Sequence, residues 1–290
     1  MSNEGQAAFD RCAPTFPLSN FPARLDTERV SFSQTNQWLL LQSGPCEPAF
    51  NMALDEGLLE SMARLGQPVL RLYGWTEAAA SFGYFQKYAE VESATTLRPL
   101  VRRPTGGGIV PHDADWTYSW TFPTSNDWYS LRAEESYRRV HEWIQGAFAR
   151  LQVSTELAPG CRKAAPGQCF AGYERSDVLR HGKKIAGAAQ RRTRIGLLIQ
   201  GSVQPPPHCE ISPSPPKSPP HPEGQMERGD WGERATESLA KIDWQQVMCD
   251  VAVRDFNAHW SEFELDTLLR ERTEVLVLEK YSQRSYNQKR

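Results

Sequence analysis

The sequence lacks the features that mark exported or membrane-spanning proteins. No apolar run among its 290 residues approaches the roughly 20 residues that a transmembrane helix needs. The first residues, MSNEGQAAFDRC, have no apolar core of the kind that a secretory signal carries. These absences predict a cytoplasmic protein without a membrane partner.

Metal-site spacing and a strong charge of one sign are also missing. The six cysteines form no CxxC pair and match no structural zinc spacing, so we expect reduced thiols and no metal. The formal net charge of −2 provides no basic field to attract nucleic acid. We therefore expect no nucleic-acid partner.

The apolar content, by contrast, is sufficient for a large core. Hydrophobic residues make up 39% of the chain, including nine Trp and twelve Phe. Residues 1–36 are polar and aperiodic, which predicts a flexible N-terminal tail. Residues 37–290 are expected to form one domain with a Pro-rich loop at 204–224. Nine prolines fall within 205–222, and proline cannot donate a backbone hydrogen bond to a sheet or helix.

Hydrophobic periodicity predicts an irregular mixture of strands and helices. A buried strand is expected at 38–42 and a helix at 47–65. The alternation WTYSWTF at 116–122 predicts a half-buried strand. Ser130 is expected to cap a second helix, and helical periodicity returns over 231–281, including Trp260. Because no regular βαβ order is present, the fold class expected is α+β.

A glycine-rich segment, RRPTGGGIVPHD at 102–113, is the first candidate site. Three consecutive glycines have no Cβ to hold a ligand off, and their N–H groups can point at an anion. Arg103 beside them offers a planar positive fork for a phosphate or carboxylate. The alternative is a glycine-rich hairpin with solvated arginines. No Gly-Lys-Ser/Thr follows, which excludes a P-loop.

A second segment, GKKIAGAAQ at 182–190, combines lysines with small side chains. Its Ala and Gly residues leave room beside the backbone for a narrow apolar tail. At about 0.8 kcal/mol per buried CH₂, an eight-carbon acyl chain would gain on the order of 5 kcal/mol there. Lys184 at the mouth of such a slot can hold the acyl oxygen or an activating phosphate. The alternative is a strand of small residues packed under a helix.

Together the two segments resemble the lipoate–protein ligase A family, whose signatures are RR-x-[ST]-GGG-x-V-x-HD and G-x-K-I-[SA]-G-[SA]-A. The resemblance runs from Trp38 to the C-terminus and includes NMALDE at 51–56, GYFQ at 83–86 and EKY at 279–281. It implies a biotin/lipoate ligase-like catalytic domain in residues 37–290. This domain has a mixed, largely antiparallel sheet flanked by helices, as in class II synthetases.

The resemblance also assigns site residues by position. Lys184 matches the lysine that contacts the acyl carbonyl or acyl-adenylate, and Arg103 matches an arginine at the same group. Pro111 departs from the aromatic residue that many members have before the histidine, so the pocket lining is expected to differ at this position. The substrate-binding residues that the resemblance implies are Arg103, Thr105, Gly106, Gly107, Gly108, His112, Gly187 and Ala188.

Cys169 is the candidate nucleophile. The segment GQCF at 167–170 resembles the Cys-Phe pair of the octanoyltransferase branch, and Cys169 lies fifteen residues before Lys184. A thiolate suits the exchange of an acyl group between carriers, and a nearby ammonium favours the thiolate. The alternative is a thiol without a catalytic role. We expect Cys169 and Lys184 to be the catalytic pair of an acyltransferase that places an octanoyl or lipoyl group on a specific lysine of a lipoyl carrier domain.

Two other functions stay open. The intact glycines at 106–108 resemble the ligase branch, which uses ATP and Mg²⁺ to form an acyl-adenylate. Segments QGS at 200–202 and WTYS at 116–119 resemble the transferase branch, which implies no cofactor. A catalytically inactive carrier-binding protein is the third alternative.

The transferase also implies a donor and an acceptor. The donor is octanoyl-acyl-carrier protein. The acceptors are lipoyl domains of 2-oxoacid dehydrogenases or the glycine-cleavage H protein.

Overall fold

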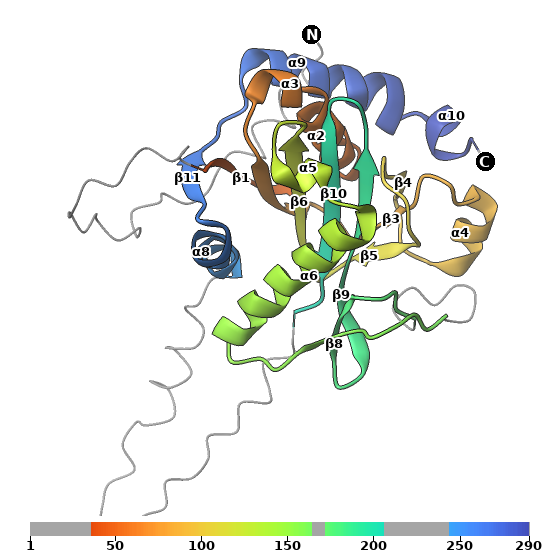
Figure 1. The fold of residues 1–290 in the computed structure, drawn as a ribbon. Helices are drawn as coiled ribbons and strands as arrows, with labels where there is room; N and C mark the ends of the chain where they lie inside the picture. Colours follow the sequence, from red (N-terminus) through yellow and green to blue (C-terminus); the bar gives the residue numbers. More distant parts are fainter. Residues whose placement is uncertain (1–35, 164–171, 206–243, 290) are drawn as a thin grey trace, which may run out of the picture.

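The computed structural model describes residues 36–163, 172–205 and 244–289, which form an α+β domain. Its main layer is an eight-stranded sheet in the order β11-β1-β2-β6-β10-β9-β8-β7, with a three-stranded sheet, β4-β3-β5, beside it (Figure 1). The predicted tail except Asn36, most of the predicted Pro-rich loop, and Cys169 lie outside the described residues.

The strands of the large sheet run in both directions. β1 pairs in parallel with β2 and β11, whereas β6 pairs antiparallel with β2 and β10, and β9 pairs antiparallel with β8 and β10. This confirms the expected mixed, largely antiparallel sheet. The strands of both sheets are β1 (Gln37–Cys46), β2 (Val69–Trp75), β3 (Ala79–Phe82), β4 (Leu100–Arg102), β5 (Val110–His112), β6 (Trp116–Pro123), β7 (Glu156–Leu157), β8 (Val178–Arg180), β9 (Lys183–Arg192), β10 (Gly196–Val203) and β11 (His259–Glu262).

Helices cover both faces of the large sheet (Figure 1). Apolar residues of α6 and α8 pack with β1, β2, β6 and β10 on one face, and those of α2 and α9 pack on the other. The helices are α2 (Pro48–Glu60), α3 (Met62–Leu65), α4 (Tyr88–Ala94), α5 (Asp127–Ser130), α6 (Ala133–Arg150), α8 (Trp244–Phe256), α9 (Thr267–Leu276), the π-helical turn η1 (Val277–Tyr281) and α10 (Arg284–Asn287). None of those in the described ranges is long and apolar enough to cross a bilayer.

β6 is buried on both faces, so the prediction of a half-buried strand is wrong. Trp120 and Phe122 pack in the aromatic core beneath α6 and α8. Ser119 and Thr121, on the opposite face, are equally buried. The Ser119 hydroxyl donates a hydrogen bond of 2.7 Å to Asp55 of α2. Alternation of apolar and small polar residues therefore separates an aromatic layer from a polar one, not core from solvent.

Three helix predictions need correction. The helix expected at 47–65 is interrupted at Ser61, which separates α2 from α3. Ser130 is the last residue of α5, and α6 begins after Arg132 without a side-chain cap. Trp260 lies in β11, because that segment pairs with the edge strand β1. Periodicity therefore indicates which residues share a face but does not fix where an element begins or ends.

A buried polar network joins α2 to the centre of the sheet. The Asp55 carboxylate pairs with the Arg71 guanidinium at 2.8 Å and accepts hydrogen bonds from the Tyr73 hydroxyl at 3.0 Å and the Gln200 amide at 2.7 Å. A buried charge is costly unless it is paired and hydrogen-bonded, and this one is both. The network holds α2 against the middle of β2 and β10, two strands that contribute residues to the candidate site.

The C-terminal segment is tied to the same region. The Glu56 carboxylate contacts Lys280 Nζ at 2.5 Å and the Tyr281 hydroxyl at 2.7 Å. Burial would raise the pKa of Glu56, but these two partners, with Arg191, outweigh it and lower the pKa. Asn287 accepts a hydrogen bond of 2.8 Å from the backbone N–H of Arg102, at the start of the glycine-rich loop.

The cysteine prediction is wrong at one position. Cys161 and Cys249 are free thiols, as expected, whereas Cys46 is disulfide-bonded. Sequence spacing indicates metal motifs but does not report which sulfur atoms the fold brings together.

Candidate functional site

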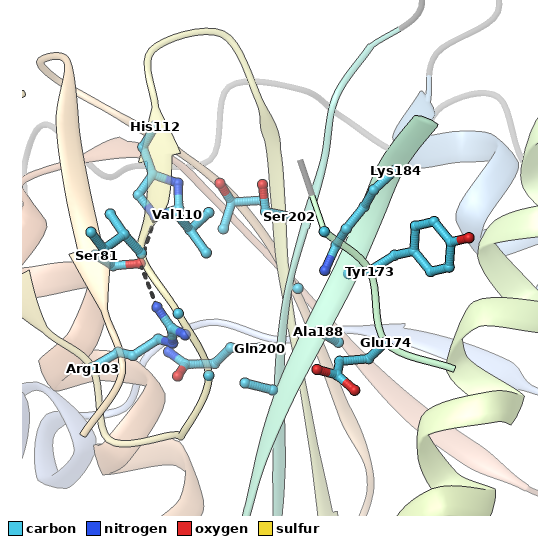
Figure 2. Close-up of a pocket in the computed structure, with 18 of the residues that line it drawn as sticks. Ser81, Arg103, Val110, His112, Tyr173, Glu174, Lys184, Ala188, Gln200 and Ser202 are labelled. Atoms are coloured by element: carbon cyan, nitrogen blue, oxygen red, sulfur yellow. Dashed lines mark hydrogen bonds between the residues drawn. The ribbon is translucent and has the colours of Figure 1, made fainter. Parts of the chain in front are cut away.

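A cavity of about 420 Å³ opens between the small sheet and strands β9 and β10. Its volume lies in the range of small-molecule sites. Figure 2 shows Ser81, Arg103 and His112 on one side and Lys184 and Tyr173 on the other. The predicted residues that line it are Arg103, Gly107, Gly108, His112, Lys184, Gly187 and Ala188. The two segments found in the sequence therefore face one another across one cavity.

The glycine-rich loop connects β4 to β5 and is braced by Arg103. Its guanidinium donates to the carbonyl oxygen of Gly106 from Nε at 3.0 Å and from Nη2 at 2.5 Å. Arg103 is only 5% exposed, so the alternative of solvated arginines is wrong. Gly107 has φ +87°, in the left-handed region that favours glycine, whereas a Cβ on Gly108 would meet nothing within 4 Å.

Thr105 and Gly106 belong to the loop but do not line the cavity. Thr105 Oγ1 donates a hydrogen bond of 2.7 Å to Gln200 Oε1. Gln200 lines the cavity, and its amide nitrogen donates to Asp55. Thr105 thus joins the loop to β10 and through it to the buried polar network.

His112 is clamped in the cavity wall. Its Nδ1 lies 2.9 Å from Asp115 Oδ2, and its Nε2 lies 2.8 Å from Ser81 Oγ. The ring also stacks on Trp75, with centroids 3.8 Å apart. Because an ionised carboxylate only accepts, a neutral His112 carries its proton on Nδ1 and accepts the Ser81 hydroxyl at Nε2. Ser81 donates to His112, and His112 donates to Asp115. These two hydrogen bonds hold the ring rigidly in the cavity wall with a defined tautomer.

Lys184 enters the cavity from β9 and is anchored from below. Its Nζ lies 2.7 Å from Asp177 Oδ2, and its side chain is 17% exposed. Asp177 is fully buried and also accepts hydrogen bonds from the Tyr137 hydroxyl and, at 2.7 Å, from the backbone N–H of Glu174. The lysine is thus presented as an ammonium in a fixed position at the wall.

Gly187 makes room for this lysine. A Cβ at Gly187 would lie 2.5 Å from Lys184 Cε and 2.6 Å from its Nζ, closer than real Cβ atoms come to other atoms. The lysine side chain therefore folds back over the backbone of Gly187 toward Asp177. Ala188 and Ala189 continue the wall with small side chains.

The groups packed beneath Lys184 are neutral except Asp177. Burial lowers the pKa of His141 to about 4, although Asp177 opposes this shift. Burial and the nearby Asp177 raise the pKa of Tyr137 and that of Tyr118 well above the ordinary tyrosine value. Near neutral pH the imidazole and both phenols are uncharged, so Asp177 supplies the negative charge of this cluster.

The structure adds three residues that no sequence motif singled out: Ser81, Asp115 and Asp177. Asp177 directly precedes the apolar strand β8 and lies seven positions before Lys184. An aspartate at the start of the β8–β9 hairpin, whose second strand carries a lysine, would have been the usable signal. Ser81 gave no such signal, because it meets His112 only through the pairing of β3 with β5. Asp115 lies three positions after His112, between β5 and β6, and that spacing alone did not single it out.

Cys169 lies outside the described residues, although both Lys163 and Gly172, which flank that segment, line the cavity. In the described ranges, no three His, Cys, Asp or Glu side chains are arranged to hold a metal ion.

Structural comparison supports the fold. A putative lipoate protein ligase from T. acidophilum with bound lipoic acid superposes with a TM-score of 0.62 at 18% identity, covering 87% of this chain and 98% of that one. A lipoate-protein ligase A bound with ATP superposes with a TM-score of 0.58 at 17% identity, covering 87% and 98% of the two chains. At such identities the likeness is one of fold.

Sequence comparison gives the family. The Octanoyltransferase LipM of Geobacillus kaustophilus is 36% identical over 180 residues, which is 57% of this chain and 64% of the relative. The Octanoyltransferase LipM of Bacillus subtilis is 33% identical over 184 residues, 59% and 66% of the two chains. The chain thus spans slightly less than two thirds of the length of these curated relatives. A sequence model of the lipoyl protein ligase A/B catalytic domain matches residues 47–204, more than half of the chain. The protein belongs to the lipoyl protein ligase A/B catalytic domain family.

Proposed function

We propose that the protein transfers an octanoyl or lipoyl group from a carrier-protein thioester to a lysine of a lipoyl domain. The observation that carries the proposal is the fixed ammonium of Lys184 at the edge of a cavity walled by Gly187 and Ala188. Relatives named as octanoyltransferases at 32–36% identity support the same reaction.

Chain connectivity supports Cys169 as the nucleophile. Three peptide units separate Cys169 from Gly172, so their Cα atoms cannot be more than about 11 Å apart. Gly172 and Tyr173 both line the cavity that holds Lys184. Cys169 therefore lies only three positions along the chain from a residue of the cavity wall, which supports its assignment as the nucleophile.

The proposed reaction has two acyl-transfer steps. The Cys169 thiolate attacks the acyl carbonyl carbon, the bond from that carbon to the donor sulfur breaks, and the donor leaves as a thiol after taking a proton. The amine of the acceptor lysine then attacks the Cys169 thioester, forms an amide and releases the cysteine thiol. Lys184 stabilises the negative charge that develops on the acyl oxygen in both steps. Arg103, the glycine-rich loop and His112 shape the cavity around the acyl group.

The proposed partners follow from this reaction. The acceptor is a lipoyl domain of a 2-oxoacid dehydrogenase or the glycine-cleavage H protein, and the donor is octanoyl-acyl-carrier protein. An archaeal lipoate protein ligase described together with its E2 lipoyl domain has the same fold, with a TM-score of 0.58, which supports the class of acceptor. This transferase requires no ATP and no metal.

One observation favours a second candidate, an ATP-dependent lipoate–protein ligase. A protein of the same fold binds ATP, and all three glycines at 106–108 are present. The ligase would activate free octanoate or lipoate as an adenylate with ATP and Mg²⁺. It would need no enzyme-bound thioester.

Intact-mass measurement separates the two candidates. Enzyme mixed with octanoyl-acyl-carrier protein and no acceptor should gain one octanoyl group, which neutral hydroxylamine removes because thioesters are labile to it. Cys169→Ser should gain none and should lose at least about 10³-fold in transfer to a lipoyl domain, since a serine hydroxyl is a weak nucleophile at its free pKa. Cys161→Ser is the matched control, because Cys161 is an exposed free thiol. Full transfer by Cys169→Ser with octanoate and ATP would contradict the transferase proposal and support the ligase.

A further inference from the structure

A buried carboxylate lies beneath Lys184 and does not reach the cavity. Asp177 is fully buried, and it is not among the described residues that line the cavity. A buried carboxylate is unfavourable unless it is paired, so the contacts of Asp177 show which groups it positions.

Both oxygens of Asp177 are occupied by donors from three different elements. Oδ1 accepts the Tyr137 hydroxyl from α6. Oδ2 accepts the backbone N–H of Glu174 and contacts Lys184 Nζ from β9, each at 2.7 Å. The helix donor and the loop donor therefore hold the carboxylate in place independently of the lysine. A carboxylate held in this way imposes its own position on the ammonium.

The side chain of a lysine is intrinsically flexible, so its position depends on the groups around it. Its flexible four-carbon stem gives a lysine many rotamers, and its ammonium is a point charge without preferred geometry. The stem of Lys184 lies over Gly187, where a Cβ would be 2.5 Å from Cε, and Asp177 Oδ1 lies 3.1 Å from the same Cβ position. The missing side chain at Gly187 leaves room for the lysine stem, and the carboxylate of Asp177 contacts the ammonium at its end.

The surroundings of Asp177 strengthen this constraint. His141 packs against Tyr137, with ring centroids 4.3 Å apart, and burial lowers the pKa of His141 to about 4. Its Nδ1 faces the carbonyl oxygen of Tyr137 at 2.8 Å, and within the described structure its Nε2 has no hydrogen-bond partner. A neutral imidazole neither replaces Lys184 as the counterion of Asp177 nor competes for its oxygens.

We propose that Asp177, held by Tyr137, is a positioning residue for Lys184. It does not touch the acyl group. It fixes the ammonium at the point of the cavity wall where negative charge develops on the acyl oxygen. The proposal rests on the proposed function in one respect, namely that Lys184 contacts the acyl group.

The central test compares steady-state kinetics of Asp177→Asn with those of the wild-type protein. The substitution keeps the shape of the side chain but places an amide against Tyr137 and Lys184. Because a misplacement of about 1 Å can cost about 10²-fold in rate, kcat for octanoyl transfer should fall about 10²-fold. KM for octanoyl-acyl-carrier protein should stay within about twofold, because the interaction that is lost acts on the transition state. Asp250→Asn is the matched control, since Asp250 pairs with Arg150 at the surface.

A double-mutant cycle shows whether Asp177 acts through the lysine. In a Lys184→Ala background, Asp177→Asn should change the residual rate of enzyme acylation by less than about twofold, because residues that act as a unit are not additive. A further 10²-fold loss in that background would show that Asp177 acts independently of Lys184, and would overturn the proposal.

A spectroscopic measurement tests the geometry without relying on activity. In a protein carrying ¹⁵N-labelled lysine, the Nζ signal absent from Lys184→Arg is assigned to Lys184. Pairing with a buried carboxylate should slow hydrogen exchange of that ammonium and keep its signal visible near neutral pH. Asp177→Asn should lose the signal, and Asp250→Asn should retain it.

The results distinguish the two levels of the proposal. If the wild-type protein transfers no octanoyl group but the Lys184 signal depends on Asp177, the proposed function fails and the positioning stands. Wild-type kcat and an unchanged Lys184 signal in Asp177→Asn would overturn the positioning and leave the proposed function intact. If Asp177→Asn does not fold, Tyr137→Phe carries the test, with an expected fall in kcat of about tenfold for one lost hydrogen bond to a charged group.

Discussion

At the scale of the residue, Lys184 carries the reaction most directly, and Lys184→Ala should reduce octanoyl transfer by at least about 10²-fold. Lys183→Ala is its neighbour control, because Lys183 is exposed on the same hairpin. Transfer is measured by intact mass of a lipoyl domain, with circular dichroism and the thermal midpoint recorded for each variant. A folded Lys184→Ala protein with near wild-type rate would show that the site is assigned wrongly.

A separate prediction concerns His141 and the pH dependence of the free energy of unfolding. Burial lowers its pKa in the folded state to about 4, from the ordinary value of 6.5. Between these values the unfolded chain binds a proton that the folded chain does not, so the free energy of unfolding falls as pH falls. From pH 7.5 to pH 5 the loss amounts to about 2 kcal/mol.

Urea unfolding of wild type and His141→Phe at the two pH values checks this. The phenylalanine variant should lose about 2 kcal/mol less than wild type on acidification. His259→Phe, at an exposed position in β11, should behave like wild type. An equal pH dependence in wild type and His141→Phe would mean that the buried histidine is not the group responsible.

At the scale of the element, the glycine-rich loop contains one glycine that its backbone conformation requires, Gly107, and one position with room for a side chain, Gly108. Gly107→Ala forces an L residue to φ +87° and brings a Cβ within 2.7 Å of Arg103 Nη2, whereas Gly108→Ala meets nothing within 4 Å. A left-handed residue costs about 1–2 kcal/mol, so the thermal midpoint of Gly107→Ala should fall by about 2–8 °C. Gly108→Ala should shift it by less than about 2 °C. Equal shifts in the two variants would contradict the assigned backbone conformation.

Strands and helices also show how far periodicity reaches. The periods at 38–42 and within 47–65 predicted elements that exist, with boundaries that moved by a few residues. The alternation in β6 indicated a strand correctly. It did not indicate that α2 covers and buries the polar face of β6. Period reports which residues share a face, whereas burial depends on what covers that face.

At the scale of the whole molecule, the cavity exists because two sheets meet. One wall comes from β3, β5 and the glycine-rich loop, and the other from β9 and β10. Ser81 and Ser202, which line opposite walls, are 121 positions apart in the chain. Sequence resemblance placed them in one site without showing their distance.

Deletion of the Pro-rich segment is the prediction at this scale. Replacing residues 205–222 by a short glycine–serine linker should leave the thermal midpoint unchanged and the transfer rate within about twofold of wild type. The reason is that the entropy of loop closure depends only weakly on loop length. The prediction rests on the nine prolines alone, because residues 206–243 lie outside the described structure. A large loss of transfer to a lipoyl domain with an unchanged midpoint would identify the segment as an element that docks the acceptor.

The sequence by itself determined the family, the α+β class and two segments of the cavity wall, because Arg103, Gly107 and Lys184 belong to motifs whose local order is itself informative. Only the tertiary structure decided that Arg103 braces the loop and that Asp177 lies beneath Lys184. The reason is physical: local propensity acts over a few residues, whereas a buried ion pair forms only where strands and a helix from distant parts of the chain exclude water together.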